Sequence, residues 1–291
     1  MRINTNINSM RTQEYMRQNQ DKMNVSMNRL SSGKRINSAA DDAAGLAIAT
    51  RMRAKESGLG VAARNTQDGI SLIQTADSAL NTVSNVLLRM RDLAVQSANG
   101  TNSDNDKAAL QKEFNQLSEQ IDYIANNTKF NGKDLLNSTS KVSIKTFDDG
   151  GAKDIDIQLT NVGKGTLSGK DADDNDVTLA NLKIGKNDVT DAGEDFDPND
   201  AKAAITVIDS IVTNIASSRA DLGATLNRLQ YNVENLNSQS TSMASSASQI
   251  EDADMAKEMS EMTKFKILNE AGISMLSQAN QTPQMVSKLL Q

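Results

Sequence analysis

Apolar residues recur every three or four positions over most of the chain, which is the period of a helix that packs one face against a neighbour. The row is thin over residues 1–30, where Glu14 and Arg17 interrupt it, so we expect this helix to be marginal alone in water. The row then becomes continuous over residues 70–94. Its apolar members are Ile3, Ile7, Met10, Met23, Met27 and Leu30, and then Ile70, Ile73, Ala76, Leu80, Val83, Leu87, Met90 and Ala94.

The ends of these helices are predicted by short polar and glycine-containing segments. Residues 31–33, Ser-Ser-Gly, break the first helix, and Ser38 with Asp41 resembles a capping box that starts the next. Residues 98–100, Ala-Asn-Gly, end that second helix. A third helix then starts near Ser103. Glycines that weaken the second helix and indicate a bend in it are Gly58, Gly60 and Gly69.

The third helix carries its own apolar row with a spacing of four and three. Asn131-Gly132 is expected to close it, because this pair readily adopts the conformation that ends a helix. Helical structure is therefore predicted for nearly all of the first 130 residues. The row comprises Leu110, Phe114, Leu117, Ile121 and Ile124.

The middle of the chain has the period of β-strands instead. Residues 142–144 and 155–159 alternate apolar with polar side chains, and Asp148-Asp149-Gly150-Gly151 between them is typical of a hairpin turn. Val177, Leu179, Leu182 and Ile184 indicate weaker strands. We therefore expect a small, turn-rich β segment.

A fourth helix is predicted to follow a cap at residues 197–200, Asp-Pro-Asn-Asp. Arg219 occupies the one position of its row that is not apolar, and the phase shifts by one residue near Glu251-Asp252, where we expect a kink or a change of partner. The row comprises Ile205, Ile208, Val212, Ile215, Leu222, Leu226, Leu229, Val233 and Leu236, and after the shift Met255, Met259, Met262, Ile267, Leu268, Met275, Leu276, Ala279 and Leu289.

This order of elements predicts a mainly α fold, in which the N- and C-terminal segments pair as a long antiparallel helical rod or coiled coil. The small β-hairpin-containing segment then lies between them in sequence. Periodicity alone leaves open whether the terminal rows pack within one chain or between chains. The predicted division has three parts: a terminal coiled-coil domain of 1–37 with 250–291, a helical rod domain of 38–137 with 198–249, and a β-rich segment of 138–197.

Composition excludes several kinds of chemistry. The 291 residues include no Cys and no His, so disulfides, thiolate nucleophiles, Ser-His-Asp triads and imidazole metal ligands are absent. Residues 171–176 resemble a calcium loop but lack its glycine and closing glutamate, and residues 163–166 are better interpreted as a turn than as a phosphate loop. We therefore expect no enzyme activity, no catalytic residue, no metal and no cofactor.

Charge is distributed unevenly along the chain. Residues 1–35 carry seven basic side chains against Glu14 and Asp21, whereas residues 138–200 carry seven lysines against fourteen carboxylates. The basic residues are dispersed and nearly without aromatics, so we interpret them as a solvated helix face and expect no nucleic-acid or membrane partner. No apolar run is long enough for a membrane span or a secretory signal.

Four motifs carry a resemblance to a known family. Residues 30–48, LSSGKRINSAADDAAGLAI, closely resemble the N-terminal signature of the bacterial flagellins, and residues 88–100, LRMRDLAVQSANG, resemble their second signature. Residues 245–254 and 278–284 are similar to their C-terminal signatures. The middle is short, so the chain resembles a flagellin without large outer domains.

The resemblance implies a subunit of the extracellular flagellar filament, secreted by a flagellum-specific type III apparatus and used for swimming. The implied partners are other copies of the chain, an export chaperone, and hook-junction and cap proteins. The terminal helices would line the inner tube. The residues expected at this polymer interface are Ile3, Ile7, Met10, Met259, Met262, Leu268, Met275, Leu276 and Leu289.

A patch recognised by animal Toll-like receptors in many flagellins matches Arg89, Leu93 and Glu113, while Asp92 replaces a glutamate that is common there. The same residues are equally suited to contacts between subunits. Two other functions compete with the filament subunit: a hook–filament junction protein with related ends, and an adhesin or enzyme on a helical stalk. The absent His and the short middle argue against the latter.

Overall fold

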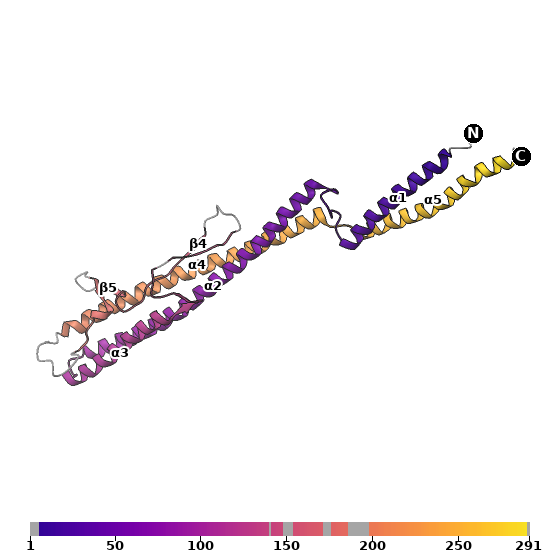
Figure 1. The fold of residues 1–291 in the computed structure, drawn as a ribbon. Coiled ribbons are helices and arrows are strands. Elements are labelled where there is room, and N and C mark those ends of the chain that lie inside the picture. The colour runs from indigo at the N-terminus through magenta and orange to yellow at the C-terminus, as the bar shows by residue number, and fades with distance from the viewer. Residues whose placement is uncertain (1–5, 140, 148–153, 171–175, 186–197, 290–291) are drawn as a thin grey trace. The chain divides into compact units, whose positions relative to one another are not determined.

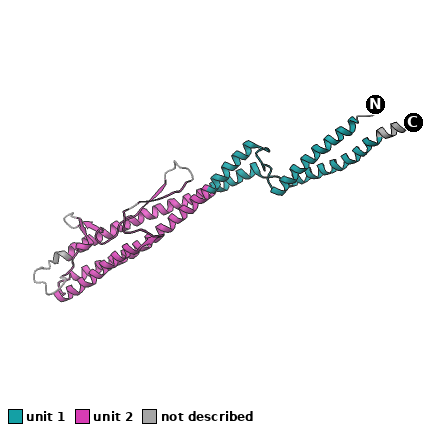
Figure 2. Ribbon diagram, viewed as in Figure 1, with its two compact units in different colours: residues 1–57, 239–291 teal, residues 58–238 magenta. Residues whose placement is uncertain are grey.

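The computed structural model describes residues 6–139, 141–147, 154–170, 176–185 and 198–289, with side chains from Ala201 to Gln281 in the last of these ranges. The chain is mainly α-helical (Figure 1). It divides into two compact units, residues 1–57 with 239–291 and residues 58–238 (Figure 2). The mainly α prediction is confirmed.

Five α-helices account for most of the described residues: α1 (Ile7–Ser32), α2 (Ala43–Ser97), α3 (Asp104–Asn127), α4 (Pro198–Glu251) and α5 (Met255–Leu289). The strands are short: β1 (Lys129–Phe130), β2 (Lys133–Asp134), β3 (Lys141–Ile144), β4 (Ile155–Gln158), β5 (Ser168–Lys170) and β6 (Asp176–Thr178), followed by the single 3₁₀ turn η1 (Leu179–Asn181).

In the unit of residues 1–57 and 239–291, α1 and α5 lie side by side (Figure 1). The helix α1 starts with Asn6, whose side-chain Oδ1 accepts a hydrogen bond from the Ser9 amide at 3.3 Å. It ends at Gly33, which has a left-handed φ of 72° and donates its amide to the Arg29 carbonyl at 2.8 Å. The predicted break at residues 31–33 is confirmed.

The predicted change near Glu251-Asp252 is also confirmed, because α4 ends at Glu251 and α5 starts at Met255. Asp254 caps the new helix: its Oδ1 accepts the amides of Ala256 at 3.0 Å and Lys257 at 3.2 Å. The shift in apolar phase therefore marks a true interruption of the backbone.

The start of α2 was predicted four residues too early. Ser38 and Asp41 do bond, since the Ser38 amide and hydroxyl both donate to Asp41 Oδ2, but they close a turn outside the helix. The helix begins at Ala43, and Asp42 Oδ1 accepts the Gly45 amide at 2.9 Å. Ser38 and Asp42 are both suitable cap residues, and the helix starts after the second of them.

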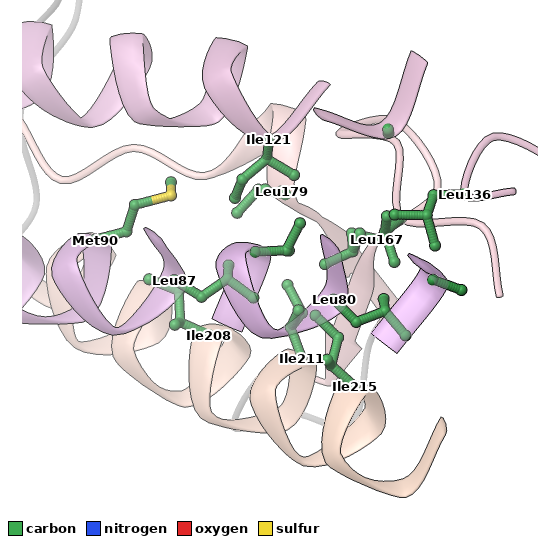
Figure 3. Close-up of a cluster of buried hydrophobic side chains, with 14 of the residues drawn as sticks. Leu80, Leu87, Met90, Ile121, Leu136, Leu167, Leu179, Ile208, Ile211 and Ile215 are labelled. Atoms are coloured by element: carbon green, nitrogen blue, oxygen red, sulfur yellow. The ribbon is translucent and has the colours of Figure 1, made fainter. Parts of the chain in front are cut away.

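The unit of residues 58–238 has a core formed by α2, α3 and α4 together with the loops and strands of the middle segment (Figure 3). The predicted apolar rows of residues 70–94, 110–124 and 205–236 are buried or half-buried there. The largest fully buried side chains of this unit include Leu80, Leu87, Met90, Phe114, Ile121, Leu136 and Ile157. Burial of each such side chain contributes about 1.5–3 kcal/mol.

The polar exception in the row of α4 has a partner on α2. Arg219 donates from Nε to Asp77 Oδ1 at 2.7 Å and from Nη1 to Asn81 Oδ1 at 3.1 Å. The hydrogen bond to Asp77 raises the pKa of the arginine. The polar residue Arg219 in the apolar row of α4 thus connects α4 to α2 through charge-assisted hydrogen bonds.

In the described part of the chain the strands form three separate antiparallel pairs. The pair of β1 with β2 precedes the predicted β segment of residues 138–197, and the other two pairs lie within that segment. The predicted pairing of residues 142–144 with 155–159 is confirmed: Val142 lies opposite Ile157, and Ile144 lies opposite Ile155. The turn predicted at 148–151 lies outside the described residues, as do residues 171–175 of the calcium-like loop. The turn predicted at 163–166 is present, since the Thr166 amide donates to the Gly163 carbonyl at 2.9 Å.

In the middle segment one strand was missed, and one prediction was wrong in detail. β5 was not predicted, because Ser-Gly-Lys has no apolar alternation. Only residues 176–178 of the weak strand region pair with β5, while residues 179–181 form η1 and Leu182 and Ile184 are buried outside any strand.

Asn131-Gly132 does not end a helix. α3 ends at Asn127, and the pair forms the turn between β1 and β2, with φ of 48° at Asn131 and 79° at Gly132. Both residues occupy the left-handed region that a two-residue hairpin turn requires. The same dipeptide serves helix ends and hairpins, and the following short strand decided between them.

The helix α2 continues through Gly58, Gly60 and Gly69 as one element, so the bend predicted there does not interrupt it. At Gly69 the absence of a side chain has a use: a Cβ there would lie 3.1 Å from Ile144 Cγ1 and 3.5 Å from Leu229 Cδ1. Packing against β3 and α4 outweighs the low helix propensity of glycine, which costs about 1 kcal/mol. The three-part domain division given above remains a prediction.

Candidate assembly surface

The α1–α5 pair is held by polar contacts distributed along its length. The Arg29 Nη1 donates to Glu258 Oε1 at 3.1 Å, and the Asn269 side-chain amide donates to Gln20 Oε1 at 2.8 Å. Further along, the Asn6 side-chain amide donates to the carbonyl of Ala279 at 2.8 Å. These three contacts show that the two helices run antiparallel.

The large apolar side chains between α1 and α5 are at most half-buried where side chains are described. The only buried residues of α1 among those described are Ser9 and Ser26. Gly272 lets the helices approach closely, because a Cβ at that position would lie 2.8 Å from Met16 Cγ. Buried or half-buried positions on α5 recur every three or four residues: Glu258, Met262, Phe265, Asn269, Gly272, Leu276 and Ala279. Such a seam removes little apolar area from water and stabilises the pair weakly.

The predicted polymer-interface residues fall into two groups. Met262 and Leu276 are half-buried in the seam. The others with described side chains remain exposed in the single chain: Ile7 at 54%, Met10 at 62%, Met259 at 55%, Leu268 at 41% and Met275 at 66%. Ile3 lies outside the described residues, and Leu289 ends α5 with its side chain outside them.

Exposed large apolar side chains are concentrated on these two helices. Besides the predicted residues, sequence reasoning missed several that belong to the same surface: Tyr15, Val25, Met27, Met255, Ile267 and Ile273. We call this set, together with Ile7, Met10, Met259, Leu268 and Met275, the terminal apolar surface. Large apolar side chains exposed at this many positions of one helix pair are typical of a protein that associates with a partner.

A carboxylate at the end of α4 connects the segments that link the helices of this unit. Glu251, 6% exposed, accepts a hydrogen bond from Arg53 Nε at Oε2 at 2.7 Å and pairs through Oε1 with Lys34. Its backbone carbonyl also accepts the amide of Arg35 at 2.6 Å, and the Ala253 amide donates to the Gly33 carbonyl at 3.0 Å. The two interruptions between helices are therefore bonded to each other.

Two cations act on the charge of Glu251. The hydrogen bond from Lys34 and then that from Arg53 lower the pKa of this carboxyl below its ordinary value, although burial opposes them. This cluster could not be predicted from the sequence, because its members are far apart along the chain. Locally, Glu251 is marked only by the shift in apolar phase beside Asp252.

The candidate receptor residues lie in the unit of residues 58–238. Arg89 on α2 donates to Glu113 Oε1 on α3 from Nη2 at 2.7 Å and from Nε at 3.1 Å, and both side chains are about half exposed. Leu93 is 1% exposed and belongs to the core. The structure therefore brings Arg89 and Glu113 together at the surface, with Leu93 packed inside.

Within the described part of the chain, no group of three or more His, Cys, Asp or Glu side chains is arranged to hold a metal ion. No helix in that part combines the length and apolar character needed to cross a bilayer. Both hollows seen beside α2 and α4 are open and lined mainly by Ser, Thr and amide side chains.

Paired long helices, a weak polar seam and exposed apolar faces define an α-helical structural subunit that is built to associate. Residues 3–141 match the family model for the bacterial flagellin N-terminal helical region, and residues 205–290 match that for the bacterial flagellin C-terminal helical region. The chain belongs to the bacterial flagellin family. It is a structural protein of the flagellar filament and not an enzyme.

Relatives support the same assignment over the full length. The chain is 48% identical to a flagellin of Listeria innocua, with 100% of this chain and 99% of that protein covered, and 40% identical to a flagellin of Bacillus subtilis, with both covered in full. A solved structure from Vibrio parahaemolyticus, classed as flagellar hook-associated, has a TM-score of 0.60 at 15% identity and covers 73% of this chain and 100% of that one. The last likeness shows the fold alone.

Proposed function

We propose that this subunit joins the growing filament through its terminal apolar surface, with Ile7, Met10, Met259, Leu268 and Met275 packed against neighbouring copies. The observation that carries the proposal is the concentration of exposed apolar side chains on α1 and α5, whose own seam buries little. Water is excluded from such faces only when several helices meet, so assembly supplies the burial that the single chain lacks.

Seeded elongation tests this surface directly. Met10→Glu and Met275→Glu each place a charge on the apolar faces, and each is expected to lower the elongation rate on filament seeds by about tenfold or more. Asn8→Glu is the matched control, because it adds the same charge at an exposed polar position of α1. Light scattering reports elongation and circular dichroism reports helicity.

Equal elongation of Met10→Glu, Met275→Glu and the control would contradict the proposed surface. Loss of helicity in all three variants would instead locate the effect in folding of α1 and α5. The two outcomes can be told apart because the unit of residues 58–238 has its own core and should keep its helicity in every variant. A partial loss of helicity therefore reports on α1 and α5.

The weak seam also supports export before folding. We infer that the chain is bound by an export chaperone, passes through a flagellum-specific type III apparatus, meets hook-junction and cap proteins, and ends in the extracellular flagellum. A seam held by a few polar contacts opens at little cost. Mechanical shearing of intact cells should release the chain in filaments, whereas recovery of the chain only from lysed cells would contradict this location.

A receptor patch at Arg89 and Glu113 is a further proposal. Both charged groups are accessible, and Leu93 holds α2 in place beneath them. Arg89→Ala and Glu113→Ala should weaken activation of cells that express a Toll-like receptor for flagellin. Arg91→Ala is the matched control, since Arg91 pairs with Asp209 instead. Equal activation by all variants would exclude the patch.

A hook–filament junction protein is the alternative function. The structural likeness to a hook-associated protein stands at 15% identity, whereas likeness to filament flagellins reaches 48% over the whole chain. Filaments of the purified chain, extended indefinitely from seeds, favour the filament subunit. A junction protein would add a limited number of copies and stop.

A further inference from the structure

Methionine is concentrated on the two terminal helices. Nine of the 13 methionines of the chain belong to α1 or α5: Met10, Met16, Met23, Met27, Met255, Met259, Met262, Met275 and Met285. Leucine would supply the same apolar volume without a sulfur atom, so the choice of thioether carries a chemical consequence.

The exposure of these sulfur-containing side chains differs sharply from that of the methionine in the core. Met10, Met259 and Met275 are more than half exposed in the single chain, and Met27 and Met255 are about half exposed. Met90, by contrast, is fully buried against the core of the unit of residues 58–238 (Figure 3). A dissolved oxidant therefore reaches the terminal helices first.

We propose that Met10, Met259 and Met275 are oxidation sites through which peroxide-class oxidants block the addition of a free subunit to the filament. This inference rests on the proposed function, because it requires these side chains to be buried between copies. A lone pair of the thioether sulfur attacks one peroxide oxygen, an S–O bond forms and the O–O bond breaks. The sulfur loses two electrons, and the proton of the transferred hydroxyl passes to the departing hydroxide, which leaves as water.

The product changes the surface on which assembly depends. A sulfoxide is polar, chiral and a strong hydrogen-bond acceptor, whereas the neighbours that the terminal apolar surface offers are, apart from Tyr15, the side chains of Ile, Leu, Val and other Met residues, which have no donor. An oxygen buried among them has no donor, so the modified subunit loses part of the driving force for addition. Within a finished filament the same sulfurs are covered, so the subunit is vulnerable only before it joins.

The inference is tested on the full-length chain with hydrogen peroxide as the probe. Peptide mapping should find sulfoxide at Met10, Met259 and Met275 of the free chain, formed at least about tenfold faster than at Met90. The same positions should oxidise more slowly in preformed filaments. Elongation of seeds by the oxidised chain should fall about tenfold or more, and methionine sulfoxide reductase with a thiol reductant should restore it.

A triple variant, Met10→Leu with Met259→Leu and Met275→Leu, should elongate seeds before and after peroxide treatment. The control variant Met27→Leu with Met255→Leu removes the other exposed sulfurs of the terminal apolar surface, which lie outside the five residues proposed to pack against neighbouring copies. It keeps Met10, Met259 and Met275 and should therefore remain sensitive to peroxide. If the triple variant fails to elongate even untreated, mapping of the unmodified sequence decides: the loss of elongation must follow sulfoxide formation at the three sites and not at Met27 or Met255.

Two results would overturn the inference. One is unchanged elongation by a chain that carries sulfoxide at all three sites, and the other is full peroxide sensitivity of the triple variant. Failure of the proposed function would be seen in a different result: the untreated natural chain would leave the seeds unextended.

Discussion

The guanidinium of Arg53 donates from Nε to Oε2 of Glu251 at 2.7 Å, although 198 residues separate the two along the chain. Arg53 lies within α2 and Glu251 is the last residue of α4, so the bond joins the start of one long helix to the end of another. Lys34 occupies the other carboxylate oxygen. The side chain of Glu251 therefore holds the connecting segment of residues 33–42 beside that of residues 252–254.

Replacement of Glu251 by Gln should loosen the unit of residues 1–57 and 239–291. The change leaves two cations without their partner, and we expect a loss of about 1–2 kcal/mol, below the cost of breaking a fully buried pair because Lys34 and Arg53 are about half exposed. Limited proteolysis at residues 33–42 should become faster. Glu234→Gln, at an exposed position of α4, is the control and should leave proteolysis unchanged.

Acid should act on the same unit through Glu251. Because its folded-state pKa is lowered below the unfolded value, its contribution to stability is complete above the unfolded pKa and is lost as the pH falls through the folded one. Helicity measured while the pH is lowered should show an acidic loss that Glu251→Gln reduces. An identical acid profile in this variant would assign the loss to other carboxylates.

The close approach at Gly272 predicts opposite effects for two glycine substitutions. Gly272→Val places a branched side chain where Met16 already lies, and overpacking should cost about 1–3 kcal/mol of α1–α5 pairing. Gly60→Ala on α2 meets open space and should stabilise the helix by about 0.5–1 kcal/mol. Thermal unfolding followed by circular dichroism measures both, and a stabilising Gly272→Val would contradict the contact.

Gln111 should be essential to the other unit. Its buried Oε1 accepts the amides of Ile184 at 2.6 Å and Gly185 at 2.9 Å, so the isosteric Gln111→Met leaves two buried donors without a partner. We expect the free energy of unfolding to fall by about 2–3 kcal/mol in urea titrations. Gln116→Met, one turn further along α3 and exposed, should change it little.

The helical part of this fold could be predicted because its information is local. The three-to-four spacing of residues 70–94, 110–124 and 205–236 placed the core of one unit correctly, and a one-residue phase shift located the break after Glu251. Turn chemistry was less decisive: Asn131-Gly132 fits a helix end as well as a hairpin, and only the strand pairing of β1 with β2 distinguishes them.

The candidate site was predictable only in part. Ile7, Met10 and Met275 are apolar positions on helices, and the structure leaves them exposed as an interface requires. The seam between α1 and α5, with Ser9 and Ser26 buried, could not be predicted from the hydrophobic pattern. Serine is mostly exposed in proteins, so its burial leaves no signal in that pattern. The bond between Arg53 and Glu251 depends on tertiary pairing and left no trace in either local sequence.

The polar contacts between α1 and α5 bear on how accurately the two helices find each other. A slip of one helical turn, about 5.4 Å, would remove Arg29 from Glu258, Gln20 from Asn269 and Asn6 from Ala279 at once. A purely apolar pair would tolerate that slip at small cost, whereas partly buried charges and amides that lose their partners penalise it. The sparse seam thus lowers the strength of the α1–α5 pairing but raises the accuracy of its alignment. Each copy of the chain therefore pairs its two terminal helices in the same register.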